Sequence, residues 1–99
     1  MHLVSAAVLD KWSTLTDAQI AAQVVMGRTA LFEVLMRRHN ERLYRTVRAI
    51  VTDDAKAEEL LQRAFVNAYA NIRQFDPSTP FVVWLTRMAV KAAATSRGE

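Results

Sequence analysis

The sequence predicts an all-α protein, a compact bundle of about four helices in one domain. Its 99 residues favour one domain with a single modest core. Only two glycines and two prolines are present, which excludes a collagen-like chain and a loop-rich β-sandwich. Apolar residues recur at three- and four-residue steps, the period of an amphipathic helix. We expect an N-terminal extension over residues 1–13 and a helical domain over residues 14–99.

The first two helices are predicted from their start signals. Thr16 and Gln19 form a capping-box pattern, and Gly27 is expected to end that helix. Thr29 is expected to cap the next helix. Its apolar stripe comprises Phe32, Leu35, Met36, His39, Leu43, Val47 and Ile50. We interpret His39 as a packed or boundary imidazole rather than a ligand, because the other histidine lies in the N-terminal extension.

The third helix is predicted to begin after Asp53 and Asp54, two good caps whose charges favour a helix N-terminus. Its expected inward residues are Ala57, Leu60, Leu61, Ala64, Phe65, Ala68 and Ile72. Its expected outward residues are Glu58, Glu59, Gln62, Arg63 and Asn67. The helix should end near residues 73–75.

Residues 76–80, Asp-Pro-Ser-Thr-Pro, predict a stiff loop because each proline holds the preceding residue extended. The fourth helix should start at residue 81. It is expected to bury Phe81, Leu85, Met88 and Ala92. Trp84 falls at the edge of that stripe, beside Arg87 and Lys91. An aromatic ring flanked by cations is typical of a surface that binds single-stranded nucleic acid. Taken alone, this segment favours a different interpretation, in which Trp84 is a core residue and the two cations extend past it to solvent.

Charge and composition exclude several functional classes. Residues 28–48 are net basic and residues 49–72 are net acidic, an alternation that could serve two different partners. Solvated helix faces explain the same alternation, and from charge alone we favour that interpretation over nucleic-acid binding. No cysteine is present, so disulfides, thiolate zinc sites and cysteine nucleophiles are excluded. Neither paired carboxylates nor a glycine-rich phosphate loop is recognisable, so we expect no enzyme, metal or cofactor. No apolar run is long enough to span a membrane, and we expect a cytoplasmic protein.

Three motifs in order along the chain resemble region 2 of the extracytoplasmic-function sigma factors. They are residues 57–65 (AEELLQRAF), residues 75–81 (FDPSTPF) and residues 84–89 (WLTRMA). The resemblance covers about two-thirds of the chain, from Phe32 to Arg97. Residues 15–27 are more weakly similar to the family's first helix.

The resemblance implies a helical bundle that binds the clamp helices of the largest RNA polymerase subunit. It also implies that the domain reads the minus-ten promoter element as melted non-template DNA. The family's polymerase contact is the outward face of the third helix, which assigns that role to Glu59, Gln62 and Arg63, with Glu58 and Asn67 as neighbours. The family's loop and fourth helix read DNA, which assigns that role to Asp76, Ser78, Thr79, Trp84, Arg87 and Lys91. An anti-sigma factor is a further candidate partner.

Several positions depart from the family pattern. Arg63 replaces a usually acidic residue, Val82 a commonly basic one and Lys91 the usual asparagine. Residues 92–97 carry fewer cations than the family's continuation, which leaves open a module that binds polymerase or an anti-sigma factor without reading DNA. The family continues with a linker and a helix-turn-helix domain, so we expect an excised domain, a truncated product or a stand-alone relative.

Overall fold

The computed structural model describes residues 14–97, and the predicted extension over residues 1–13 lies outside them. Four α-helices make up most of this part of the chain: α2 (Asp17–Val25), α3 (Phe32–Arg48), α4 (Asp54–Ala70) and α5 (Phe81–Arg97). Short 3₁₀ turns at Thr29–Leu31 and Ile72–Gln74 precede α3 and follow α4. Residues 14–97 contain no strand, which confirms the all-α prediction.

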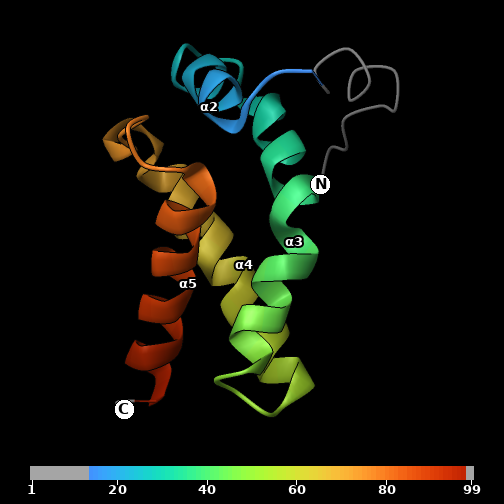
Figure 1. The fold of residues 1–99 in the computed structure, drawn as a ribbon. Helices are drawn as coiled ribbons and strands as arrows, with labels where there is room; N and C mark the ends of the chain where they lie inside the picture. The colour runs from blue at the N-terminus through green and yellow to red at the C-terminus, as the bar shows by residue number, and fades with distance from the viewer. Residues whose placement is uncertain (1–13, 98–99) are drawn as a thin grey trace.

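The helices form a bundle in which α4 packs against both α3 and α5 (Figure 1). The short helix α2 packs against α3 and against the turn that follows α4. In Figure 1 it lies across one end of the three longer helices. The side of α4 that faces away from the bundle therefore remains exposed to solvent between α3 and α5.

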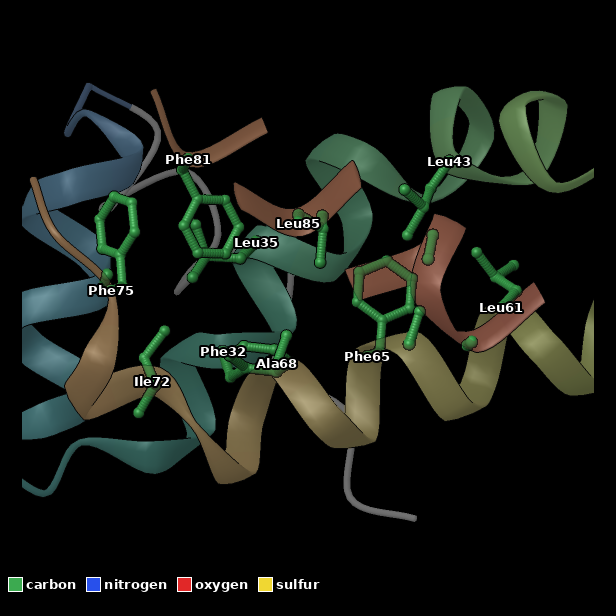
Figure 2. Packing of buried hydrophobic residues seen from close by; sticks show 14 of the residues in the cluster. Phe32, Leu35, Leu43, Leu61, Phe65, Ala68, Ile72, Phe75, Phe81 and Leu85 are labelled. Carbon is green, nitrogen blue, oxygen red and sulfur yellow. The ribbon is translucent and has the colours of Figure 1, made fainter. Parts of the chain in front are cut away.

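The core is formed by one apolar face from each helix. Figure 2 shows this packing from close by. The largest fully buried side chains are Ile20, Leu35, Leu43, Val47, Leu60 and Leu85. The inward set predicted for the third helix is buried throughout, and the described residues include no buried polar or charged side chain. Apolar burial, at about 1.5–3 kcal/mol for each large side chain, therefore holds the bundle together.

The predicted buried stripe of α5 requires one correction. Met88 is only partly buried, whereas Ala89 and Ala93 are completely buried. The stripe is centred between Leu85 and Ala89, which leaves Met88 at its margin beside α4. The prediction was therefore wrong in placing Met88 in the buried stripe and in leaving out Ala89 and Ala93.

The ends of the helices follow the predicted chemistry in three cases. Thr16 and Gln19 form the capping box, with N···O distances of 3.1 and 2.8 Å. Gly27 has a φ of +106°, a left-handed conformation that glycine adopts without a Cβ penalty, just after α2 ends. The Asp53 carboxylate caps α4 by accepting a hydrogen bond from the backbone N–H of Ala55 at 3.1 Å.

The predicted cap at Thr29 is wrong. Thr29 opens the 3₁₀ turn, and no side-chain hydrogen bond caps either this turn or α3. The backbone N–H of Leu31 instead donates to the carbonyl of Arg28 at 3.1 Å. Because the 3₁₀ turn leads directly into α3, Thr29 lies inside helical structure and not ahead of it.

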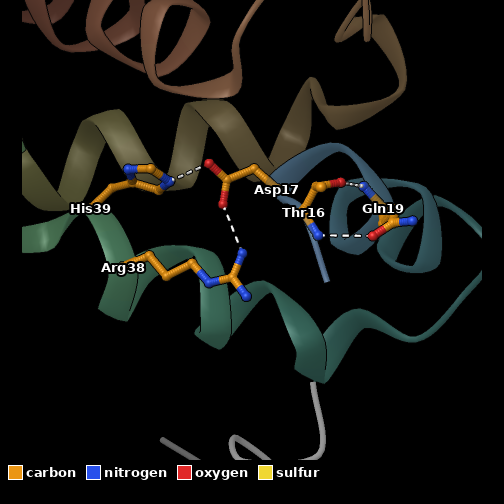
Figure 3. A network of polar contacts seen from close by, with 5 residues as sticks. All are labelled: Thr16, Asp17, Gln19, Arg38 and His39. Atoms are coloured by element: carbon orange, nitrogen blue, oxygen red, sulfur yellow. Dashed lines mark hydrogen bonds and ion pairs between the residues drawn. The ribbon is translucent and has the colours of Figure 1, made fainter. Parts of the chain in front are cut away.

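A polar contact ties α2 to α3 (Figure 3). The Asp17 carboxylate accepts hydrogen bonds from His39 Nε2 at 2.8 Å and from Arg38 Nη1 at 3.0 Å. The His39 hydrogen bond is the main cause of a lowered pKa at Asp17; partial burial raises that pKa and Arg38 lowers it further. The His39 ring also packs on Phe81, at 5.6 Å between centroids, which agrees with the predicted boundary imidazole.

We expect Asp17→Asn to lower the free energy of unfolding by about 1–2 kcal/mol at pH 5, because it weakens charge-assisted hydrogen bonds. The folded pKa of Asp17 lies below its unfolded value, so this stability is present above about pH 4 and is lost as the pH falls through the folded pKa. Urea unfolding of both proteins between about pH 5 and pH 2 measures the effect. A difference that stays constant over this range would contradict the assignment.

Candidate functional site

The five residues assigned to polymerase contact lie together on the exposed face of α4. Glu58, Glu59, Gln62, Arg63 and Asn67 are all exposed. Within this set, a Glu59 carboxylate oxygen lies 3.2 Å from an Arg63 nitrogen. An exposed pair four residues apart on a helix contributes only a few tenths of a kcal/mol, so it yields readily to a docking partner.

One edge of this face borders a groove between α3 and α4, which we call the α3–α4 groove. It encloses about 550 Å³. Its lining residues are Phe32, Met36, Asn40, Glu58, Leu61, Gln62, Phe65, Val66 and Tyr69. The side chains of Val66 and Tyr69 are 65% and 42% exposed, although both are large and hydrophobic. An apolar groove with polar residues at its rim is typical of a surface that binds another protein.

Sequence reasoning missed the apolar members of this groove. Val66 and Tyr69 stand four and seven residues after Gln62, so all three side chains share one side of α4. An apolar pair on an otherwise polar helix face was the available signal. The tyrosine ring packs edge-on against Phe32, at 5.3 Å between centroids, which fixes one wall of the groove.

The other edge of α4 borders a second groove, the α4–α5 groove, which encloses about 380 Å³. Its lining residues are Arg63, Asn67, Asn71, Gln74, Met88, Lys91, Ala92 and Thr95. The structure thus brings Lys91, assigned to DNA, together with Arg63 and Asn67, assigned to polymerase. Two cations and three amides beside an apolar floor suit a phosphate and the edge of a base.

The loop before α5 is shaped by Asp76. Its carboxylate accepts a hydrogen bond from the backbone N–H of Ser78 at 2.9 Å, and its carbonyl accepts one from Thr79 at 2.9 Å. Hydrogen bonds from the backbone and the hydroxyl of Ser78 hold the pKa of Asp76 below its usual range. Asp76 therefore stays ionised at neutral pH and stabilises the turn.

Trp84 belongs to a cluster of three aromatic rings where the loop meets α5. Its ring centroid lies 5.4 Å from Phe75 and 5.6 Å from Phe81, and those two rings lie 5.2 Å apart in an edge-on contact. Trp84 is half-buried and packs against the core. The ring therefore packs against the two residues that flank the loop, Phe75 and Phe81, and only part of it is exposed to solvent.

The remaining residues assigned to DNA do not meet in one pocket. Thr79 lines a third concave surface, the loop cavity, between the loop, α2 and α3. Lys91 lies instead in the α4–α5 groove, while Ser78 and Arg87 are exposed and line none of the three surfaces. The assigned DNA residues are thus distributed around the loop and along α5.

No helix within residues 14–97 combines the length and the apolar character that crossing a membrane requires. In that same range, no three histidine, aspartate, glutamate or cysteine side chains are grouped so as to hold a metal ion.

The sequence also matches known proteins over these helices. The family described as Sigma-70 region 2 matches residues 35–97. The chain is 31% identical over 74 residues to the RNA polymerase sigma factor CnrH of Cupriavidus metallidurans, a match that covers 75% of this chain and 39% of CnrH. It is 27% identical over 77 residues to the RNA polymerase sigma-H factor of Pseudomonas aeruginosa, covering 78% of this chain and 40% of that protein.

A third relative is the ECF RNA polymerase sigma factor SigW of Bacillus subtilis. It is 31% identical over 67 residues, which cover 68% of this chain and 36% of SigW. The chain therefore spans about two fifths of the length of the relatives that it matches. The family match covers most of α3 and all of α4 and α5, the helices that border both grooves. The chain belongs to the sigma-70 region 2 family, and its helices form a region 2 domain of the extracytoplasmic-function type.

Proposed function

We propose that this chain is the part of an RNA polymerase sigma factor that joins core polymerase to the melted minus-ten promoter element during transcription initiation. One observation carries the proposal: two grooves of different chemistry flank the same helix, α4. The apolar groove suits a protein helix, and the cationic groove suits a nucleic-acid strand. One rigid helix between them would hold the two partners in a fixed relation.

The polymerase side of the proposal is the α3–α4 groove, with the clamp helices of the largest subunit as its occupant. Val66 and Tyr69 are exposed apolar anchors, and Gln62 and Glu58 stand beside them as hydrogen-bonding groups. Aromatic and apolar anchors surrounded by polar groups supply most of the binding energy in protein interfaces. Because core polymerase acts in the bacterial cytoplasm, the proposal includes a cytoplasmic location.

The DNA side of the proposal is the α4–α5 groove. Lys91 and Arg63 are placed to neutralise a phosphate, while Asn67 and Asn71 offer amides to the edge of a base. Capturing an unstacked base costs a few kcal/mol, which these contacts must offset. The groove would therefore favour a strand whose bases are already unpaired over an intact duplex.

We expect Lys91→Gln to weaken the binding of single-stranded minus-ten DNA by roughly 3- to 10-fold. It should also make the log–log salt slope less negative by about 0.7, the value for one lost phosphate contact. Fluorescence anisotropy of a labelled non-template strand measures both quantities. Lys56→Gln is the matched control, because Lys56 lines neither groove. An equal effect of both variants would contradict a specific contact at Lys91.

A second candidate function is a protein-interaction module that binds polymerase or an anti-sigma factor without reading DNA. The separation of the residues assigned to DNA favours it, because Thr79 lines the loop cavity whereas Lys91 lines the α4–α5 groove. Titrating the labelled strand with and without core polymerase separates the two functions. Binding to polymerase with no strand capture in either titration would establish the interaction module.

A further inference from the structure

The α3–α4 groove presents apolar side chains that residues 14–97 leave uncovered. Val66 and Tyr69 are 65% and 42% exposed, and both line the groove beside Leu61 and Phe65. Apolar surface in contact with water is unfavourable, and a patch of this kind promotes unspecific association. A chain that has not bound polymerase is therefore stabilised if apolar residues of its own cover the groove.

Residues 1–13 have a composition that suits this role. Their sequence, MHLVSAAVLDKWS, precedes the described residues, and besides Met1 it carries five apolar side chains larger than alanine: Leu3, Val4, Val8, Leu9 and Trp12. The charges of Asp10 and Lys11 cancel, so no net side-chain charge opposes burial of the segment. Tryptophan is also among the residues that most often anchor one protein surface on another.

The described chain starts close to the groove. Asp17 accepts hydrogen bonds from Arg38 and His39 at 3.0 and 2.8 Å, which fixes this end of the chain beside α3 (Figure 3). Asn40, the next residue of α3, lines the groove. A helix with its side chains is about 10–12 Å across, whereas 13 extended residues span up to roughly 43–47 Å. Residues 1–13 are therefore long enough to pass around α3 and lie along the groove.

Glu58 adds a charge that the same segment can match. Among the described residues that line the groove it alone is charged, and it forms no ion pair within residues 14–97. Lys11 is the neighbour of Trp12 in the sequence. A segment that places Trp12 against the apolar side chains thus brings an ammonium group to the rim, where Glu58 is exposed. This charge complementarity favours residues 1–13 over an acidic occupant.

We propose that residues 1–13 dock in the α3–α4 groove of the free chain and compete there with the polymerase clamp helices. The inference rests on the proposed function, because that function assigns the groove to the clamp. A short tether gives the segment an effective concentration of about 1–2 mM, so an intrinsic Kd of about 1 mM is enough to fill the groove half to two thirds of the time. The apparent affinity for the clamp then falls about 2- to 3-fold.

Trp12 gives a direct test in the full chain. The chain has two tryptophans, so Trp84→Phe leaves Trp12 as the only one. We expect acrylamide to quench Trp12 about half as efficiently in this folded protein as in the same protein unfolded in urea. Adding Val66→Lys should roughly double the quenching constant, because an ammonium group in the groove opposes apolar docking. Val90→Lys is the matched control, since Val90 lies on α5 outside the groove.

The competition is measured with a fragment that carries the clamp helices. Leu9→Asp should raise the affinity of the full chain for this fragment about 2- to 3-fold, the factor expected when a tethered competitor is removed. It should also raise the quenching of Trp12 in the Trp84→Phe protein. Ser5→Asp is the matched control, because it adds the same charge at a polar position of the segment.

The outcomes separate this inference from the proposed function. If Val66→Lys abolishes clamp binding but leaves the quenching of Trp12 unchanged, the proposed function stands and the docking of residues 1–13 is wrong. If Val66→Lys exposes Trp12 but clamp binding is the same in every variant, the segment docks and the polymerase surface is wrong. Protection of Trp12 that grows with protein concentration would identify a second copy as the partner and overturn docking within one chain.

Discussion

Val66→Lys is expected to weaken binding to the polymerase clamp helices by about 100-fold, with a change of less than about 0.5 kcal/mol in the free energy of unfolding. Val66 is 65% exposed in the free domain, so the substitution removes little packing. In the complex the new ammonium group would be buried against apolar side chains of the α3–α4 groove, which costs several kcal/mol unless it is paired. A 100-fold loss corresponds to about 2.7 kcal/mol.

Calorimetric titration with a fragment that carries the clamp helices measures this loss. Val90→Lys is the matched control, because Val90 is a 42% exposed valine of α5 outside both grooves of α4. Thermal melts of both variants check that the fold is intact. If Val66→Lys binds as tightly as the wild type, or if Val90→Lys loses as much, the α3–α4 groove is not the docking surface.

The second large effect is expected at Trp84. Trp84→Ala should lower the free energy of unfolding by about 2–3 kcal/mol and the Tm by roughly 10–20 °C. The ring packs against Phe75 and Phe81, and its removal leaves a void beneath the loop. The expected loss lies at the lower end of the range for aromatic-to-alanine changes because Trp84 is only half-buried.

Chemical denaturation and strand binding should be measured on the same Trp84 variants, at a temperature where each is folded. Trp84→Phe should recover more than half of the lost stability, since a smaller ring still reaches both neighbours. Val83→Ala, an exposed change at the adjacent position, should have little effect. Unchanged stability with lost single-strand affinity would instead identify Trp84 as a stacking platform for a base.

The helices were predictable because their signals are local. The inward residues of α4 repeat with helical period, and each residue predicted inward is buried, from Ala57 to Ala68 in α4 and Ile72 in the turn that follows. The capping box at Thr16 depends on two residues three positions apart. The predicted cap at Thr29 was wrong because no nearby residue indicates that a 3₁₀ turn continues directly into α3.

The grooves were not predictable in the same way, because each depends on how two helices rotate against one another. A helical wheel places Arg63 on the outer face of α4 and Lys91 on one edge of α5, but only the packed bundle brings both into one groove. The same holds for Arg42 and Thr79, which come from distant segments. The sequence shows Val66 and Tyr69 as apolar residues on a polar helix face. It does not show that residues of α3 complete a groove beside them.

The absence of buried polar side chains in residues 14–95 has an evolutionary consequence. In this part of the domain the polar and charged side chains lie at the surface, and the interior contains only apolar ones. Surface substitutions rarely change stability by more than about 0.5 kcal/mol. Mutation can therefore change the exposed side chains with little risk to folding, which allows one scaffold to present many different surfaces.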